Sequence, residues 1–129
     1  MTGINEDRTR LGAMLSDLDL APVEQGANGL RIVLDGIYAT VMVYGDGTLS
    51  LVCSVRGDGR GWDLNGVNAA NNRVRFAKFA VDHNNLVLEA DFVCCIASRE
   101  ALEELRQVLK LWRMALHELQ LLIEELVPA

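Results

Sequence analysis

The sequence is short of cysteine and histidine, and these shortages exclude whole classes of protein. Three cysteines in 129 residues, two of them adjacent at Cys94 and Cys95, cannot form the paired framework of a small extracellular disulfide protein. Neighbouring residues of a strand point to opposite faces, so this adjacent pair would also hold a metal ion poorly. The two histidines, His83 and His117, lie far apart in the sequence. We therefore expect free thiols in a reducing cytoplasm and no metal site.

Long apolar runs and an excess of positive charge are missing as well. No segment reaches the roughly 18 consecutive apolar residues that a membrane-spanning helix needs. The opening residues, MTGINEDRTRLG, are too polar for a signal peptide. A net charge of −6 argues against non-specific binding to nucleic acid or to an anionic membrane. We expect a cytoplasmic protein without membrane contact.

No complete catalytic arrangement is visible either. The glycine-rich segment Arg56–Gly61 (RGDGRG) has neither the lysine of a P-loop nor the spaced glycines of a dinucleotide-binding fold. Glu89 and Asp91 share one face of a predicted strand, as a pair of catalytic acids would, but no nucleophile or cofactor loop accompanies them. The sequence therefore predicts a protein that is not an enzyme, with no catalytic residue and no cofactor.

What the sequence does contain is a clear alternation of apolar and polar residues. Half of the residues are apolar, which supports one packed domain over residues 1–129. Tight turns are expected at Asp35-Gly36 and at Gly45-Asp46-Gly47, because these residues tolerate a positive φ. The alternation predicts five strands, at residues 30–35, 38–44, 49–55, 74–81 and 86–93.

Three helices complete the predicted fold. The first carries Leu11 and Leu15 at helical spacing and ends before Pro22. The second covers residues 63–72, with Asp63 as its N-cap and Leu64 facing inward. The resulting fold class is α+β: an antiparallel five-stranded sheet with helices packed on it, in the order α-β-β-β-α-β-β-α.

The last helix gives the strongest periodic signal. Ser98 is its expected N-cap, and apolar residues then recur at spacings of 3 and 4 up to Leu126. A helix of about 28 residues would be roughly 42 Å long, whereas a five-stranded sheet is roughly 20–25 Å wide. We therefore expect part of this apolar ridge to extend past its own sheet and to contact a second copy or a partner. The residues predicted to make this contact are Leu109, Trp112, Leu116 and Leu119.

The segment between the second helix and the last strand is rich in asparagine. Asn68, Asn71, Asn84 and Asn85 fall at predicted helix ends and turns, where asparagine is favoured for backbone reasons alone. Basic and aromatic residues also alternate here, as they do on platforms that bind single-stranded nucleic acid. An alternative function is therefore nucleic-acid contact by an accessory protein. The residues that would make it are Arg60, Arg73, Arg75 and Lys78.

The same segment carries a resemblance to a known family. The sequence runs Val67-Asn68-x-x-Asn71, then Arg75-Phe76-Ala77-Lys78, Asp82, and Leu86-Val87-Leu88-Glu89 with Asp91, followed by the helix SREALEELRQVLKLW. This pattern, over residues 62 to 125, resembles the bacterial YbjN family, whose fold is similar to that of class I type III secretion chaperones. The glycine-rich loop at 56–61 and Asn72 depart from the family's pattern.

The resemblance implies a non-enzymatic, dimeric protein that binds other polypeptides or regulates through them. Such chaperones hold an extended segment of a client protein along apolar grooves and strand edges. The prediction is therefore an interaction module, chaperone-like or regulator-like, that binds a client segment as a homodimer. The family's signature positions look structural, so the resemblance assigns no functional residue.

Overall fold

The computed structural model describes residues 4–44 and 47–128 of the chain. Within these residues, the predicted three helices and five strands occur in the predicted order, and three short strands, of two or three residues each, are added to them. The helices are α1 (Ile4–Asp17), α2 (Leu64–Arg73) and α3 (Ala101–Glu124). The strands are β1 (Val23–Gln25), β2 (Gly29–Leu34), β3 (Ile37–Val43), β4 (Thr48–Arg56), β5 (Arg60–Gly61), β6 (Lys78–Asp82), β7 (Asn85–Val93) and β8 (Val127–Pro128).

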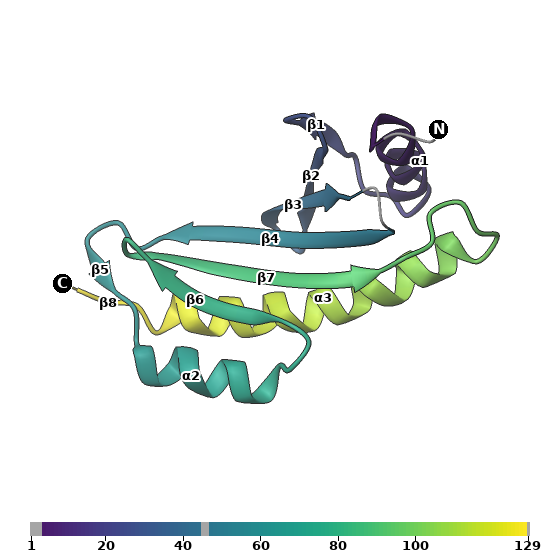
Figure 1. Ribbon diagram of the computed structural model, residues 1–129. Helices are drawn as coiled ribbons and strands as arrows, with labels where there is room; N and C mark the ends of the chain where they lie inside the picture. Colours follow the sequence, from purple (N-terminus) through teal and green to yellow (C-terminus); the bar gives the residue numbers. More distant parts are fainter. Residues whose placement is uncertain (1–3, 45–46, 129) are drawn as a thin grey trace.

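The main sheet is antiparallel, with the strand order β1-β2-β3-β4-β7-β6 (Figure 1). The predicted α+β class is confirmed, but the predicted number of five strands is wrong, because this sheet has six. The extra strand is β1, which has only three residues, all of them exposed, and so shows no apolar alternation. Two further residues, Arg60 and Gly61, pair with Val127 and Pro128 as a separate small ribbon.

The hairpin between β2 and β3 forms at the predicted turn. Asp35 and Gly36 have φ values of 51° and 81°, the pair of positive values that the tight hairpin turn needs. Gly45 and Asp46 of the second predicted turn lie outside the described residues. Across the ladder, Leu30 lies opposite Val41, which lies opposite Leu51, so the apolar residues of neighbouring strands fall on one face.

All three helices lie on that apolar face or at its edge. α1 packs on β2 and β3, α3 runs along β7, and α2 lies beside both β6 and α3 (Figure 1). The core between them contains Leu11 and Leu15 of α1 and the inward residues of the central strands, all nearly inaccessible to water. Burial of this apolar surface is the main stabilising term of the fold.

The ridge of α3 is the largest contribution to this core. Leu109, Trp112, Leu116 and Leu119, predicted to contact a partner, are only 3%, 0%, 1% and 0% exposed. Our expectation that this part of the ridge extends past its own sheet is therefore corrected. α3 runs along the nine-residue strands β4 and β7, each roughly 30 Å long, and not across the narrower width of the sheet (Figure 1). The sheet is long enough in this direction to cover the ridge.

Three local predictions are also corrected. Glu100, not Ser98, stands at the N-cap of α3, and the buried Ser98 hydroxyl has no hydrogen-bond partner among the residues that the structure describes. Leu64, predicted to face inward, is 60% exposed. β6 begins at Lys78 and not at Val74, since the Val74 N–H still bonds to the Ala70 carbonyl at the end of α2. The predicted N-cap of α2 is confirmed, because the Asp63 carboxylate accepts from the Asn65 N–H at 3.1 Å.

Two leucines of α3 provide a test of this packing. Leu116→Ala should lower the free energy of unfolding by about 2–5 kcal/mol, because it leaves a cavity beneath the sheet. The matched change Leu121→Ala, at a position that is 38% exposed on the same helix, should cost less than about 1 kcal/mol. Urea unfolding followed by circular dichroism measures both. Equal losses for the two variants would contradict this placement of the ridge.

Candidate functional site

The second face of the sheet carries no helix in the described part of the chain. We call it the open face. One row of side chains crosses it from edge to edge, each residue paired in register with the next. This row mixes apolar, polar and charged groups, and its members are Val23, Arg31, Thr40, Val52, Glu89 and Lys78. Beside it, Tyr38 is 66% exposed, and the guanidinium of Arg31 lies 5.3 Å from the centre of its ring.

The ladder between β6 and β7 stops before β7 ends. β6 has five residues and β7 has nine, and the last pair in register is Lys78 with Glu89. Beyond that pair, Arg75, Phe76 and Ala77 diverge from β7 and leave a hollow of about 320 Å³. We call it the edge hollow. Its lining residues are Arg75, Phe76, Ala77, Lys78, Glu89, Ala90 and Asp91.

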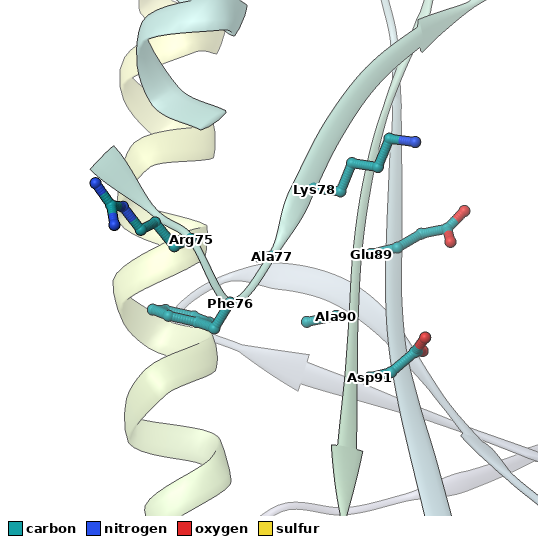
Figure 2. A pocket seen from close by; sticks show the side chains of 7 residues that line it. All are labelled: Arg75, Phe76, Ala77, Lys78, Glu89, Ala90 and Asp91. Carbon is teal, nitrogen blue, oxygen red and sulfur yellow. The ribbon is translucent and has the colours of Figure 1, made fainter. Parts of the chain in front are cut away.

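The side chains of the edge hollow divide between its two sides. Figure 2 shows Lys78, Glu89 and Asp91 directed to one side, and Arg75 and Phe76 directed to the other, toward α3. Phe76 is half-buried against Phe92, with the ring centres 6.3 Å apart. The hollow therefore has one side, continuous with the open face, that carries Lys78, Glu89 and Asp91, and a second side next to α3 that carries the Phe76 ring and the Arg75 guanidinium.

The ladder between β3 and β4 is also incomplete, because the first residues of β3 do not pair with the last residues of β4. Their register covers only Thr40 with Val52 to Val43 with Leu49. The space that remains is a hollow of about 400 Å³, which we call the β3–β4 notch. The Cys53 thiol donates to the Tyr38 carbonyl across it at 3.3 Å. Its lining residues are Gly36, Ile37, Tyr38, Cys53, Ser54, Val55, Arg56, Asp58 and Ile123.

The outer edge of β6, in contrast, is blocked by one asparagine. The Asn71 amide donates to the Phe79 carbonyl at 2.8 Å, and its oxygen accepts from the Phe79 N–H at 2.7 Å. Both backbone groups that Phe79 directs away from β7 are thus satisfied from α2. Asn84 is structural as well, since its side-chain amide donates to the Arg60 carbonyl and its backbone carbonyl accepts from Trp62 Nε1. For these two asparagines the contacts agree with the scaffold interpretation of the sequence.

The four residues predicted to contact nucleic acid do not form one surface. Arg73 makes a two-pronged bond to Glu118, which raises the pKa of the guanidinium and compensates its charge. Lys78 lies opposite Glu89 in register. Arg60 precedes the ten-residue helix α2 and Arg73 ends it, a separation of roughly 15 Å along the axis. Phe79 is buried, so it offers no ring for base stacking. Contact with nucleic acid at these residues stays a prediction, without a continuous basic patch among the described residues.

The three cysteines are free thiols. Burial raises the pKa of both Cys53 and Cys94 to about 11, whereas Cys95 is exposed. Among the described residues, no group of three or more His, Cys, Asp or Glu side chains could hold a metal ion, and no helix is long and apolar enough to span a membrane.

Comparison with known proteins supports the fold. No protein-family model matches the chain, and no curated protein matches it in sequence. Among solved structures, YbjN from E. coli matches with a TM-score of 0.64 at 17% identity, over 99% of this chain and 97% of that one. The chain has a YbjN-like, type III secretion chaperone-like fold.

Two further matches are structures of complexes. A chain of the ExsC–ExsE complex matches with a TM-score of 0.66 at 18% identity, over 95% of this chain and 97% of that one. The complex of the Yersinia pestis type III secretion chaperone SycH with a stable fragment of YscM2 matches with a TM-score of 0.55 at 14% identity, over 86% and 98%. At these identities the likeness shows the fold alone.

The block on β6 can be tested with neighbouring asparagines. Asn71→Ala should lower the free energy of unfolding by about 1–3 kcal/mol, because it leaves the Phe79 N–H and carbonyl without partners. Asn72→Ala, at an exposed position of the same helix, is the control and should change stability by less than about 0.5 kcal/mol. Thermal unfolding of both variants measures the two changes in stability. An Asn71→Ala variant as stable as the parent would contradict the role of Asn71 in satisfying the edge of β6.

The burial of Cys53 and Cys94 predicts the order in which the three thiols react. At pH 8 a group with a pKa of about 11 is ionised to only about one part in a thousand, and the thiolate is the reactive form. In the native chain, a chromogenic disulfide reagent should therefore modify Cys95 quickly, and Cys53 and Cys94 only after unfolding. The variant Cys95→Ser should abolish the fast phase. A fast phase that persists in this variant would contradict the burial of the other two thiols.

Proposed function

We propose that this chain is a non-enzymatic, cytoplasmic interaction module that binds an extended segment of another protein and acts as a homodimer. The observation that carries the proposal is a sheet with an uncovered face and interrupted ladders, in a fold shared with chains from two protein complexes. Unpaired backbone groups at a strand edge accept another extended chain, and neighbouring apolar side chains add affinity. Free thiols accord with a reducing compartment.

The dimer requires a surface that is not already used by the core. Besides its buried ridge, α3 presents three apolar side chains on its outer side: Leu111, Met114 and Leu121, which are 37%, 58% and 38% exposed. Met114 also lines a shallow groove of about 400 Å³ with Val74 at the end of α2. Lys110 and Glu124 stand near opposite ends of this stripe, so a second copy lying antiparallel would place unlike charges together. We assign the dimer contact to this outer stripe.

Two substitutions on α3 separate the outer stripe from the buried ridge. Met114→Asp should convert a species of twice the 14.2 kDa chain mass into monomer while the circular dichroism spectrum stays native. Leu116→Asp should instead unfold the chain, because it places a charge in the core without a partner. Light scattering on both variants gives the masses. A monomeric parent protein would remove the dimer from the proposal, and a folded, monomeric Leu116→Asp variant would return the contact to the ridge.

The binding of a partner is tested in the native host. A tagged copy of the chain should retain a specific protein on affinity purification, and mass spectrometry identifies it. The purified pair should then form a complex by itself, and limited proteolysis should reduce the partner to one short protected segment. If the pair does not re-form, or if the partner binds through a folded domain, the proposal that the chain binds an extended segment is wrong.

A further inference from the structure

The free part of β7 lies beyond the start of β6 and faces the edge hollow. The Gly57 N–H donates to the Asn84 carbonyl, and the Cys94 N–H donates to the Gly47 carbonyl, so the even-numbered residues of β7 direct their backbone groups toward β4. The odd-numbered residues direct theirs toward β6 because successive residues alternate. Glu89 is the last of these to face a β6 residue, Lys78. Asp91 and Val93 therefore present backbone N–H and carbonyl groups that no residue of the described ranges pairs with, at positions about 7 Å apart along this edge.

The charge at this edge is unbalanced in a specific way. Glu89 lies opposite Lys78, but Asp91 has no β6 residue opposite it, and its neighbour on β4 is Ser50. Asp91 is exposed and makes no ion pair among the described residues. A cross-strand neighbour of opposite charge stabilises a strand pair, and one of like charge destabilises it. A strand added here is therefore favoured if it places a lysine or arginine opposite Asp91.

The side of the edge hollow next to α3 also favours one kind of side chain at the position that follows the basic residue in an added strand. In an added strand, the neighbour of the basic residue points to the opposite side, toward α3. On that side it meets the half-buried ring of Phe76 (Figure 2), which packs against the half-buried ring of Phe92. An apolar side chain at this position would cover apolar surface of these two rings that water now contacts. Val93, which is 84% exposed, lies two residues beyond Asp91 on the open face.

We propose that the free edge of β7 at Asp91 and Val93 binds an extended segment of another protein in which basic and apolar residues alternate. The segment continues the line of β6 along β7, with its basic side chain against Asp91 and its apolar side chain against Phe76 and Phe92. This inference rests on the proposed function and gives it a location. The acidic net charge of −6 favours the approach of such a segment.

The competing location is the β3–β4 notch. By the same alternation, Ser54 and Arg56 of β4 direct their backbone groups into that notch, where β3 no longer pairs with them. Its lining includes Ile37, Val55 and Ile123 and one mutual ion pair, Arg56 with Asp58. The notch thus offers backbone groups and apolar surface, but no uncompensated carboxylate that would select a basic residue.

The test uses a phage-displayed library of random linear peptides, selected on the whole chain. The proposal expects enriched peptides that alternate basic and apolar residues. A selected peptide should bind Asp91→Lys about tenfold more weakly, because one favourable cross-strand charge pair becomes a repulsive one. Asp17→Lys, the same charge change on an exposed position of α1, is the matched control and should bind normally.

A proline pair tests the backbone contact. Val93→Pro removes an edge-facing N–H without removing a bond to β4, and should weaken the peptide roughly fivefold. Ser54→Pro removes the equivalent N–H in the β3–β4 notch and should leave binding unchanged. Circular dichroism confirms that both variants remain folded. If Val93→Pro does not fold, amide hydrogen exchange on the unmodified chain replaces it, and bound peptide should slow exchange at Asp91 and Val93.

The outcomes separate this inference from the proposed function. Peptides that bind the Asp91 and Val93 variants normally but lose affinity for Ser54→Pro would place the site in the notch, and only this inference would fail. Slowed exchange at Ser54 and Arg56 in place of Asp91 and Val93 would have the same meaning. A selection that enriches no peptide would overturn both the site and the binding of extended segments.

Discussion

The contact on which the rest of the structure depends is that between the ridge of α3 and the inner face of β4 and β7. Trp112, Leu116 and Leu119 are almost completely buried there, together with Leu51 and Leu88 from the strands. Because α3 runs along these two long strands, they are held straight by a single helix over their whole length (Figure 1). β1 and β2 do not lie above α3, so this helix does not constrain their direction. They turn steeply away from β4 and β7 (Figure 1).

This arrangement explains where the ladders are interrupted. α2 must fit beside β6 and α3, and the Arg73–Glu118 bond joins its last residue to α3. The chain leaves α2 at Val74, and Phe76 packs on Phe92 before β6 can begin. β6 therefore starts too late to reach the last residues of β7. The free edge at Asp91 and Val93 is thus a consequence of how α2 is anchored and not a local irregularity of β7.

Much of this fold follows from periodicity, and the failures have physical causes. The strands from Leu30 to Phe92 show alternating burial because each has one face on the core, and the 3.6-residue period of α3 marks its buried ridge. Periodicity shows which residues of α3 form its apolar ridge, but not the direction in which the helix crosses the sheet. The comparison of the helix length with the sheet width therefore led to the wrong prediction that the ridge is uncovered. β1 carries no signal, since none of its residues is buried. Val74 and Phe76 alternate with Arg75, and the sequence therefore predicts them in the same strand as Lys78. The capping of α2 removes them from that strand, and the buried residue of β6 is Phe79, which is out of phase with them.

Only part of the candidate site could be predicted from the sequence. The sequence places Glu89 and Asp91 on one face of a strand, but it does not show that Lys78 lies opposite Glu89 while no β6 residue lies opposite Asp91. That distinction depends on the register and on the residue at which β6 begins, both of which are tertiary properties. It also distinguishes the end of β7 from the edges at β1 and β6 in the described part of the sheet. Natural proteins protect sheet edges with short strands, charges or capping groups. β1 is short, and Asn71 caps β6 at Phe79. At the end of β7 the protection is a carboxylate, which repels a second copy of the same acidic edge but attracts a strand that carries a cation there. A charge in this position therefore acts as a barrier to self-association and, for one class of partner, as the means of recognition.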